Sequence, residues 1–409
     1  MNLPFFIARR NLLKQKGNFS SFIIRIAIVA TTLSVAVMIV ALSVVGGFKA
    51  SIREKLYAFE GHIHIHQYGL NTFQTASMPP VQEDRVLEKQ IAAVPGVTHI
   101  APFIKRAGIL QFDGKMEGLM FKGVPENFHF SQGISFSGNK IDYSDTAYSK
   151  DIVLSRATAD RLELKVGDMA QIYFLEEGST FPRIRKVRLA GIFHTAMEEV
   201  DRANALCDIR LLRNISSWEE GDISAYQLSL ADDKQSEKIA DKILEEYLVS
   251  PLYSFTMEET YAHVFAWLKM MDVNASIILS IMAIVAIINL AVALVILIVE
   301  QARMVGVLKA QGMTVGQMRS VFLYYAGLIA GIGIFAGNVL ALGLAWLQQE
   351  TGFLKLSETS YYMTTVPFRV IWWHVLVTDL ATLLLCIACM LLPTLYIRRI
   401  HPARVLQFK

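Results

Sequence analysis

The sequence of 409 residues is short of charge and of cysteine. Charged residues make up 18% of the chain and hydrophobic residues 53%, whereas soluble domains usually carry about a quarter charged residues. Of the three cysteines, Cys207 stands alone, and Cys386 and Cys389 lie in an apolar stretch. A disulfide framework is therefore excluded for the soluble part. The sequence has no G-x-x-x-x-G-K-[ST] segment, so it does not bind ATP phosphates through a P-loop.

Charge is nearly absent from four stretches in particular. Each is long enough to cross a hydrocarbon core, which takes roughly 20 apolar residues. The first stretch favours an uncleaved anchor, because its apolar run is longer than the core of a signal peptide and no A-x-A site ends it. We predict transmembrane helices within residues 21–48, 266–300, 319–348 and 371–397.

The segment between the first two spans, 49–265, has the composition of a soluble domain. Its pattern mixes short strands with helices, which is typical of an α+β fold, and its length allows two subdomains. The fold class is thus four transmembrane helices with a large α+β domain inserted between the first and the second. The expected helices are 83–93, 155–164 and 233–248, and the expected strands are 107–112, 118–124, 152–154, 169–175 and 186–193.

Basic residues mark the side of the membrane on which each end lies. The segments 1–20 and 398–409 each carry basic residues and no acid, and the turn 301–318 is also basic. Since basic residues near membrane ends stay on the cytoplasmic side, we place both termini and this turn inside. The domain 49–265 and the balanced loop 349–370 then lie outside. Residues 1–20 also have the pattern of an amphipathic interfacial helix.

The second span is flanked by two features that could transmit movement across the membrane, a helical stalk and a tight turn. Residues 256–272 are predicted to be helical and to continue into the span, forming one stalk of about 45 residues, well beyond the membrane thickness. In the turn, Gly312 is placed to end a helix in the left-handed conformation, and Thr314 with Gln317 forms a capping box. The turn would fit a groove on a cytoplasmic partner; an ordinary helical hairpin is the alternative.

The residues from Glu300 to Gly312 follow the pattern E-x-x-R-x-x-G-x-L-K-x-x-G. This resembles the signature of the FtsX/MacB (type VII) superfamily of ABC transporter permeases, and within it the chain is most similar to the LolC/LolE lipoprotein-releasing permeases. Weaker matches follow in order along the chain, at 8–10, 42–48, 61–65, 122–124, 164–168, 190–193 and 402–406.

The resemblance implies a membrane subunit in the bacterial inner membrane. Two permease chains, identical or different, pair with a dimer of separate ABC ATPase subunits, which bind the ATP and Mg²⁺. No cofactor or catalytic residue is expected in this chain, and no nucleic-acid partner. ATP-driven motion would extract a lipoprotein from the outer leaflet and pass it to a periplasmic carrier. The residues expected to contact the ATPase are Glu300, Arg303, Gly306, Lys309 and Gly312.

The resemblance also implies two binding regions. An outward-opening cleft for acyl chains would lie between the first two spans, with plain lipid-facing or interhelical packing as the alternative. A hook for the carrier would lie in the loop 175–186, where an ordinary hairpin tip is equally expected. The cleft candidates are Met38, Leu42, Val45, Phe48, Leu268 and Met271, and the hook candidates are Phe181, Pro182 and Arg183.

Polar and small residues suggest three further features. Asn338 and Asp379 lie at matching depths in the last two spans, and we predict a hydrogen bond or a shared water between them. The alternating His62, His64 and His66 predict a polar strand face; zinc binding is a lesser alternative, and no metal site is assigned. Small residues in the third span favour packing within the chain over a dimer seam: Gly327, Gly331, Gly333, Gly337 and Gly343.

Two other functions compete with lipoprotein release. The first is a MacB-like exporter component or an FtsX-like mechanotransmission subunit. The second is a membrane-anchored sensor or enzyme with an external catalytic domain. We disfavour the second because the sequence has no recognisable nucleophile–base motif and because such a protein would not account for the turn at 300–312.

Overall fold

The computed structural model describes residues 6, 19–69, 78–128, 134–175, 181–357, 361 and 363–389. The chain divides into two compact units, each treated separately below. The predicted N-terminal helix and C-terminal tail lie almost wholly outside the described residues. The first unit comprises Met1–Lys49, Leu268–Lys355 and Thr365–Lys409, and the second Ala50–Trp267 and Leu356–Thr364.

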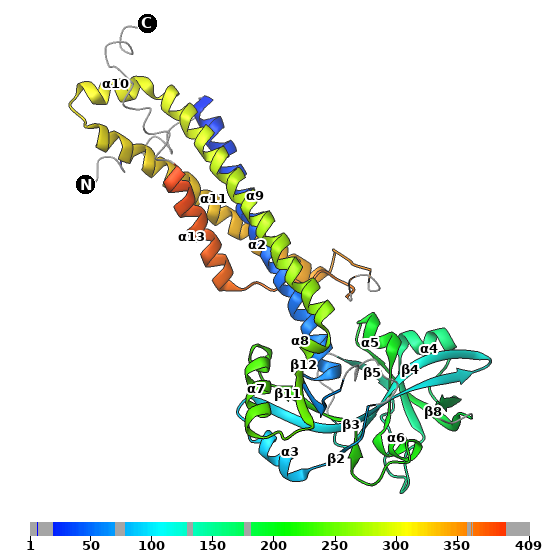
Figure 1. Cartoon of the computed structure of the whole chain (residues 1–409). Helices are drawn as coiled ribbons and strands as arrows, with labels where there is room; N and C mark the ends of the chain where they lie inside the picture. The colour runs from blue at the N-terminus through cyan, green and yellow to red at the C-terminus, as the bar shows by residue number, and fades with distance from the viewer. Residues whose placement is uncertain are drawn as a thin grey trace. The chain divides into compact units, whose positions relative to one another are not determined.

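The first unit is built from long apolar helices (Figure 1). Among the described residues, three helices are long and apolar enough to cross a membrane: α2, α9 and α11. The fourth predicted span is described only as far as Cys389. Its described part forms a shorter apolar helix, α13. The bounds are α2 Phe19–Glu60, α9 Ala262–Glu300, α10 Ala302–Ala310, α11 Val315–Thr351 and α13 Trp372–Cys389.

Helix α2 continues well past the predicted end of the first span at residue 48. It runs for 42 residues, about 63 Å at 1.5 Å per residue, and the last part belongs to the second unit. Helix α9 likewise extends beyond its predicted segment, because it begins at Ala262, before the predicted start at residue 266. The predicted unbroken helix from 256 is wrong at one point: α8 (Met257–Thr260) is separated from α9 at Tyr261.

Two of the five glycines singled out in the third predicted span, which is α11, explain how closely this helix approaches α2. A Cβ at Gly333 would lie 2.7 Å from Thr31 Cβ, and one at Gly337 would lie 2.9 Å from the Thr32 carbonyl oxygen. Gly327, Gly331 and Gly343 have no atom within 4 Å of such a Cβ. Packing within the chain is therefore confirmed for Gly333 and Gly337 only.

A further glycine contact fixes the loop between α11 and α13. A Cβ at Gly47 of α2 would lie 2.5 Å from the Pro367 carbonyl oxygen, and Arg369 N donates to Ser43 O at 3.0 Å. The buried Gln348 side chain donates to the carbonyl oxygens of both Leu354 and Val366. The loop therefore lies directly on the backbone of α2.

The second unit is an α+β domain on one large sheet (Figure 1). The strand order is β12–β1–β11–β3–β4–β9–β6–β8–β5, and β7 pairs with both β3 and β8. The bounds are β1 Ile63–Gln67, β3 Val97–Phe112, β4 Lys115–Val124, β5 Ser135–Gly138, β6 Asp151–Ser155, β7 Met169–Phe174, β8 Arg183–His194, β9 Asn204–Asp208, β11 Ala225–Leu230 and β12 Leu252–Thr256. The short β2 (Val81–Gln82) and β10 (Asp222–Ile223) pair separately.

The double pairing of β7 closes part of the sheet into a ring. Going round it, the strands are β3, β4, β9, β6, β8 and β7. The first half of β3 pairs instead with β11, from Val97 to Phe103. One strand of 16 residues therefore belongs to both parts of the domain, and both parts share one continuous buried core.

Short helices cover the sheet close to where the sequence predicts them. The predicted helix 83–93 is α3 (Arg85–Ala92), 155–164 is α4 (Arg156–Leu162) with Ser155 as its N-cap, and 233–248 contains α7 (Ser236–Glu246). Two further helices lie on the ring, α5 (Glu198–Ala203) and α6 (Ile209–Ile215). The predicted strand 107–112 is only the second part of β3.

The α2–α11 packing can be tested with a matched pair of glycines. Gly337→Ala forces a methyl group against the backbone of α2, and we expect it to lower the free energy of unfolding by about 1–3 kcal/mol. Gly343→Ala adds the same methyl group where space is open, so stability should stay the same or rise slightly. Thermal unfolding of the purified full chain in detergent measures both. Equal stability of the two variants would contradict this packing.

Candidate functional site

The turn between α9 and α11 is built as the sequence predicts. Gly312 ends α10 with a left-handed φ of +90°. Thr314 Oγ1 accepts from Gln317 N, and the Gln317 side chain accepts from Thr314 N, completing the capping box of α11. These local contacts hold α10 between the two long helices as a separate short helix.

Helix α10 is anchored on one side and exposed on the other. Val305, at 1% exposure, belongs to the same apolar cluster as Leu297 of α9 and Met318 of α11. Val307 is 40% exposed. A short helix fixed in this way is suited to contact another protein through its outer face.

The predicted ATPase-contacting residues are distributed over this turn. Glu300 is the last residue of α9, Gly306 is buried in α10, and Lys309 lies in the last turn of α10. Arg303 lies on α10, and its side chain is outside the described residues. No partner subunit is present, so their contact with an ATPase stays a prediction.

The predicted cleft residues are only partly accessible. Met38, Phe48 and Leu268 are buried, while Leu42, Val45 and Met271 are partly buried. Met38 lies in a cluster that joins α2 with Ala341 of α11 and Val375 of α13. For these residues to line a cleft, α2 would have to move away from its neighbours.

The predicted hook is the β7–β8 hairpin, in which Phe174 pairs with Arg183. Phe181 is 79% exposed, and Pro182 next to it is partly buried. Arg183 Nη1 donates to Ile215 O at 2.6 Å and to Ser217 Oγ at 2.7 Å. Arg183 therefore holds the hairpin to the end of α6. Residues 176–180 of the loop lie outside the described residues.

The predicted polar pair is present between the last two apolar helices. Asn338 Nδ2 donates to Asp379 Oδ2 at 2.8 Å and also to Ile334 O at 3.0 Å, so the predicted hydrogen bond is confirmed. Both residues line a groove of about 790 Å³ whose other walls are largely apolar, including Phe335 and Trp372.

The three alternating histidines do not form a polar strand face. His64 and His66 are each 1% exposed. The His62 ring stacks on Tyr57 with 4.3 Å between centroids, and its Nδ1 accepts from Leu230 N at 3.2 Å. In the part of the chain that the structure describes, no group of three His, Cys, Asp or Glu side chains is placed to hold a metal ion.

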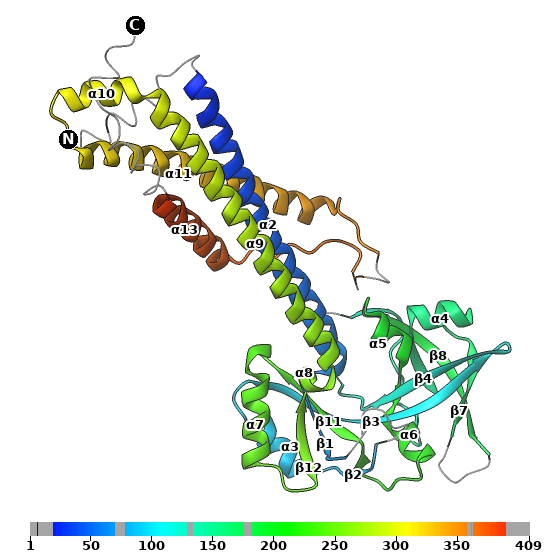
Figure 2. The ribbon, with the colours of Figure 1, turned by 45° about the horizontal axis from the view of Figure 1, so that its top comes forward.

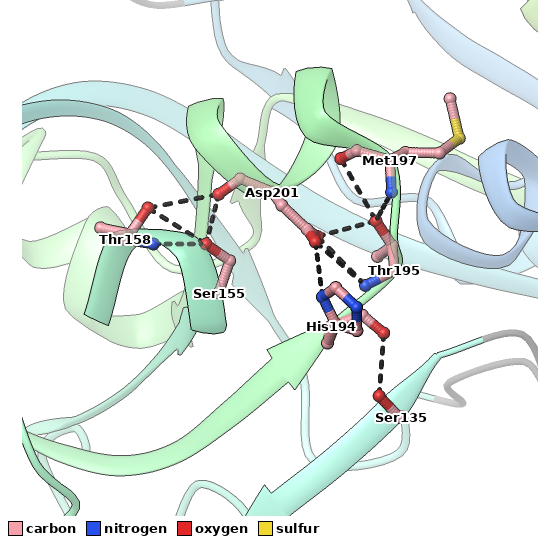
Figure 3. Close-up of polar contacts among 7 residues, drawn as sticks. All are labelled: Ser135, Ser155, Thr158, His194, Thr195, Met197 and Asp201. Atoms are coloured by element: carbon pink, nitrogen blue, oxygen red, sulfur yellow. Dashed lines mark hydrogen bonds and ion pairs between the residues drawn. The ribbon is translucent and has the colours of Figure 1, made fainter. Parts of the chain in front are cut away.

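A serine, a histidine and an aspartate come close together at one end of the ring (Figure 3). The Asp201 carboxylate accepts from His194 Nδ1 at 3.0 Å and from Thr195 Oγ1 at 2.7 Å. The fully buried Ser155 hydroxyl donates to the backbone carbonyl of Asp201 and accepts from Thr158 N as the cap of α4. Because folding contacts use this hydroxyl, the group gives no support to a catalytic domain.

A buried charged cluster at the end of α2 is not among the features predicted from the sequence. Glu60 is 0% exposed, and its carboxylate accepts from Lys105 Nζ at 2.8 Å to each oxygen and from Lys122 Nζ at 3.2 Å. Lys122, also 0% exposed, donates in addition to Phe59 O at 2.8 Å and to Gln227 Oε1 at 2.7 Å. Burial lowers the pKa of Lys122 to about 8, although the nearby Glu60 charge opposes the shift.

A local signal for this cluster does exist. An acid in the last turn of a helix opposes the helix dipole, and Glu60 stands there directly before Gly61, which has a φ of +74°. Such a residue needs cationic partners. The sequence does not identify them, because β3 and β4 bring them from far along the chain.

Two family models match the chain. One, the MacB-like periplasmic core domain, covers residues 26–246, which is over half of the chain. The other, the FtsX-like permease C-terminal domain, covers residues 276–402.

Similar curated proteins match over nearly their whole length. A lipoprotein-releasing system transmembrane protein LolE from Haemophilus influenzae is 24% identical over 99% of both chains. A LolC protein from Xylella fastidiosa is 24% identical over 97% of this chain and 96% of its own length. Among solved structures, the periplasmic region of MacB from Actinobacillus actinomycetemcomitans aligns at 12% identity with a TM-score of 0.35, over 52% of this chain and 97% of that one.

The buried histidines predict an acid-sensitive domain. Burial lowers the pKa of His62 to about 4 and also lowers those of His64 and His66. Between the ordinary value of 6.5 and pH 4, the unfolded chain binds more protons than the folded chain, so the free energy of unfolding falls as the pH falls. We expect a loss on the order of 1–3 kcal/mol, measured as thermal unfolding of the full chain between pH 7 and 4.5.

Two variants isolate the contribution of His62. His62→Asn places an amide oxygen near the position of Nδ1 but cannot titrate, so it should flatten the dependence on pH. His263→Asn, on the exposed side of α9, should keep the wild-type slope. A wild-type slope in His62→Asn would show that His62 does not contribute.

Proposed function

This chain belongs to the FtsX-like permeases that carry a MacB-like periplasmic core domain, and from this premise we propose that it is a subunit of a lipoprotein-releasing ABC transporter. In this proposal, a partner ATPase supplies the energy, and the permease extracts lipoproteins from the outer leaflet of the inner membrane and transfers them to a periplasmic carrier. The observation that carries the proposal is the similarity to LolE over 99% of both chains.

The proposed topology has four spans and both termini in the cytoplasm. It is supported by the three long apolar helices, by the apolar α13 and by the basic residues at both ends of the chain and in the turn 301–318. The α+β domain then lies in the periplasm, and α10 faces the cytoplasm, where an ATPase binds.

The energetics of release call for an ATP-driven machine. A triacylated lipoprotein buries dozens of methylene groups in the membrane, each contributing about 0.8 kcal/mol, so spontaneous release is negligible. The work is coupled to the outside by helices rather than by a pore. This is consistent with α2 and α9, each of which continues from an apolar span into the α+β domain.

A MacB-like exporter component or an FtsX-like mechanotransmission subunit is the second candidate. The match of the MacB-like periplasmic core model favours it. The turn 301–318 and the helices α2 and α9 would serve either function, so the two candidate functions differ in the cargo that is transported.

Reconstitution tests both the function and the turn. The chain, purified with its ATPase and any second permease chain, should release lipoprotein from proteoliposomes to a soluble carrier only when ATP is hydrolysed. Gly312→Val places a branched side chain at a left-handed φ, which costs on the order of 1–2 kcal/mol, and should reduce ATPase binding and release together.

The control for this variant is Gly316→Ala, four residues further on, where a Cβ meets only Thr314 Oγ1 at 4.0 Å. It should release lipoprotein at the wild-type rate. ATPase coupling without any release in the wild type would reject lipoprotein as the cargo and favour the second candidate.

The hook hypothesis has a separate test. Phe181→Ala removes the most exposed apolar side chain of the β7–β8 hairpin, and we expect it to weaken carrier binding about tenfold or more. Met169→Ala, which truncates a 53% exposed side chain on the neighbouring β7, is the matched control. Titration of the purified chain with carrier measures the affinity, and equal affinities for the two variants would rule out the hook.

A further inference from the structure

Helices α2 and α9 enter the α+β domain at the same carboxylate. Glu60, the last residue of α2, accepts a hydrogen bond from the Tyr261 hydroxyl at 3.2 Å. Tyr261 stands directly before the first residue of α9. Through Lys105 of β3 and Lys122 of β4, the same carboxylate is bound to the strands at the centre of the sheet. One side chain therefore connects both helices to the sheet.

In the Glu60 cluster, all the hydrogen-bonding capacity of the Lys122 ammonium group is used. Lys122 Nζ has three acceptors, Phe59 O, Glu60 Oε2 and Gln227 Oε1, which matches the three protons of an ammonium group. Phe59 O is one of the carbonyl groups that the end of a helix leaves without a partner inside the helix. Because a buried charge is tolerated only when it is fully paired, the end of α2 cannot shift relative to β4 without breaking these bonds.

Further contacts join the two helices along their outer parts, where they lie side by side (Figure 2). Within the second unit, Arg53 Nη2 of α2 lies 3.7 Å from Glu258 Oε1, and Arg53 Cζ lies 5.6 Å from the centre of the Phe265 ring. Within the first unit, Lys49 Nζ lies 2.6 Å from Asp272 of α9. These contacts align the helices, whereas the Glu60 carboxylate contacts Tyr261 next to α9 and both lysines of the sheet at once.

We propose that Glu60 and Tyr261 are positioning residues for transport, which make α2 and α9 move the external domain as one body. The inference rests on the proposed function for its readout of release, but the geometry that carries it does not depend on the cargo. Without the Tyr261 bond, α9 can shift against α2 while Glu60 keeps its two lysines. Motion arriving through α9 then reaches the sheet through α8 and β12 at its edge, and no longer through the Glu60 carboxylate at its centre.

Tyr261→Phe tests this with minimal change to the fold. The variant removes one hydroxyl group and leaves the Glu60–Lys105 and Glu60–Lys122 ion pairs in place. Tyr253→Phe removes a hydroxyl group from a 37% exposed ring of β12 in the same domain and serves as the control. Both are made in the full chain and assayed in the reconstituted complex.

For Tyr261→Phe we expect ATP hydrolysis close to wild type and a decrease in lipoprotein released per ATP of about threefold to tenfold, with no such decrease in Tyr253→Phe. The melting temperature should stay near that of the wild type. Unchanged release per ATP would overturn the proposal. A fall in melting temperature that accompanies the lost release would assign Tyr261 a merely structural role and overturn it as well.

A second measurement separates this inference from the identity of the cargo. Hydrogen exchange of β1 and β3 is compared in the complex with and without ATP and vanadate, in the absence of lipoprotein. The wild type and Tyr253→Phe should show a nucleotide-dependent change that Tyr261→Phe lacks. If the wild type shows that change but releases no lipoprotein, only the proposed cargo fails. The same change in Tyr261→Phe would reject the role of Tyr261.

Discussion

The paired charge of Glu60 is the interaction on which the connection between helices and sheet depends. A carboxylate at the end of a helix and away from water is unfavourable on its own account, because both burial and the helix dipole oppose it. Lys105 and Lys122 make it tolerable, and they stand directly opposite each other on the paired strands β3 and β4. The end of α2, the sheet and the start of α9 are therefore mutually dependent.

The part of α2 before Lys49 is positioned by close approach to its neighbours. Gly333 and Gly337 of α11 leave room for its Thr31 and Thr32, and its own Gly47 leaves room for the backbone at Pro367. In a membrane the hydrophobic effect does not drive helices together, so close packing at small residues contributes much of their association. The same helix is thus held mainly by close packing in the first unit, where its Lys49–Asp272 pair is partly exposed, and by buried ion pairs in the second.

Features that depend on neighbours in sequence were predictable. The Ser155 cap, the left-handed Gly312 and the Thr314–Gln317 capping box are local, and each is present. The Asn338–Asp379 bond followed from matching depths in two apolar helices. The full length of β3, the closure of the ring through β7 and the partners of Glu60 depend on pairing between distant segments. Nothing in a local pattern specifies which distant strands will meet, so these features needed the structure.

The strengths of the contacts along α2 and α9 also indicate where movement can occur. The Lys49–Asp272 pair is partly exposed, with side-chain exposures of 22% and 55%, and such pairs contribute only about 0–1 kcal/mol. Separating a buried, fully paired carboxylate from its partners costs several kcal/mol. In the proposed mechanism, a force applied at the turn 301–318 would therefore loosen the helices first at the exposed pair. The Glu60 cluster would stay intact, and the domain would follow the helices instead of separating from them.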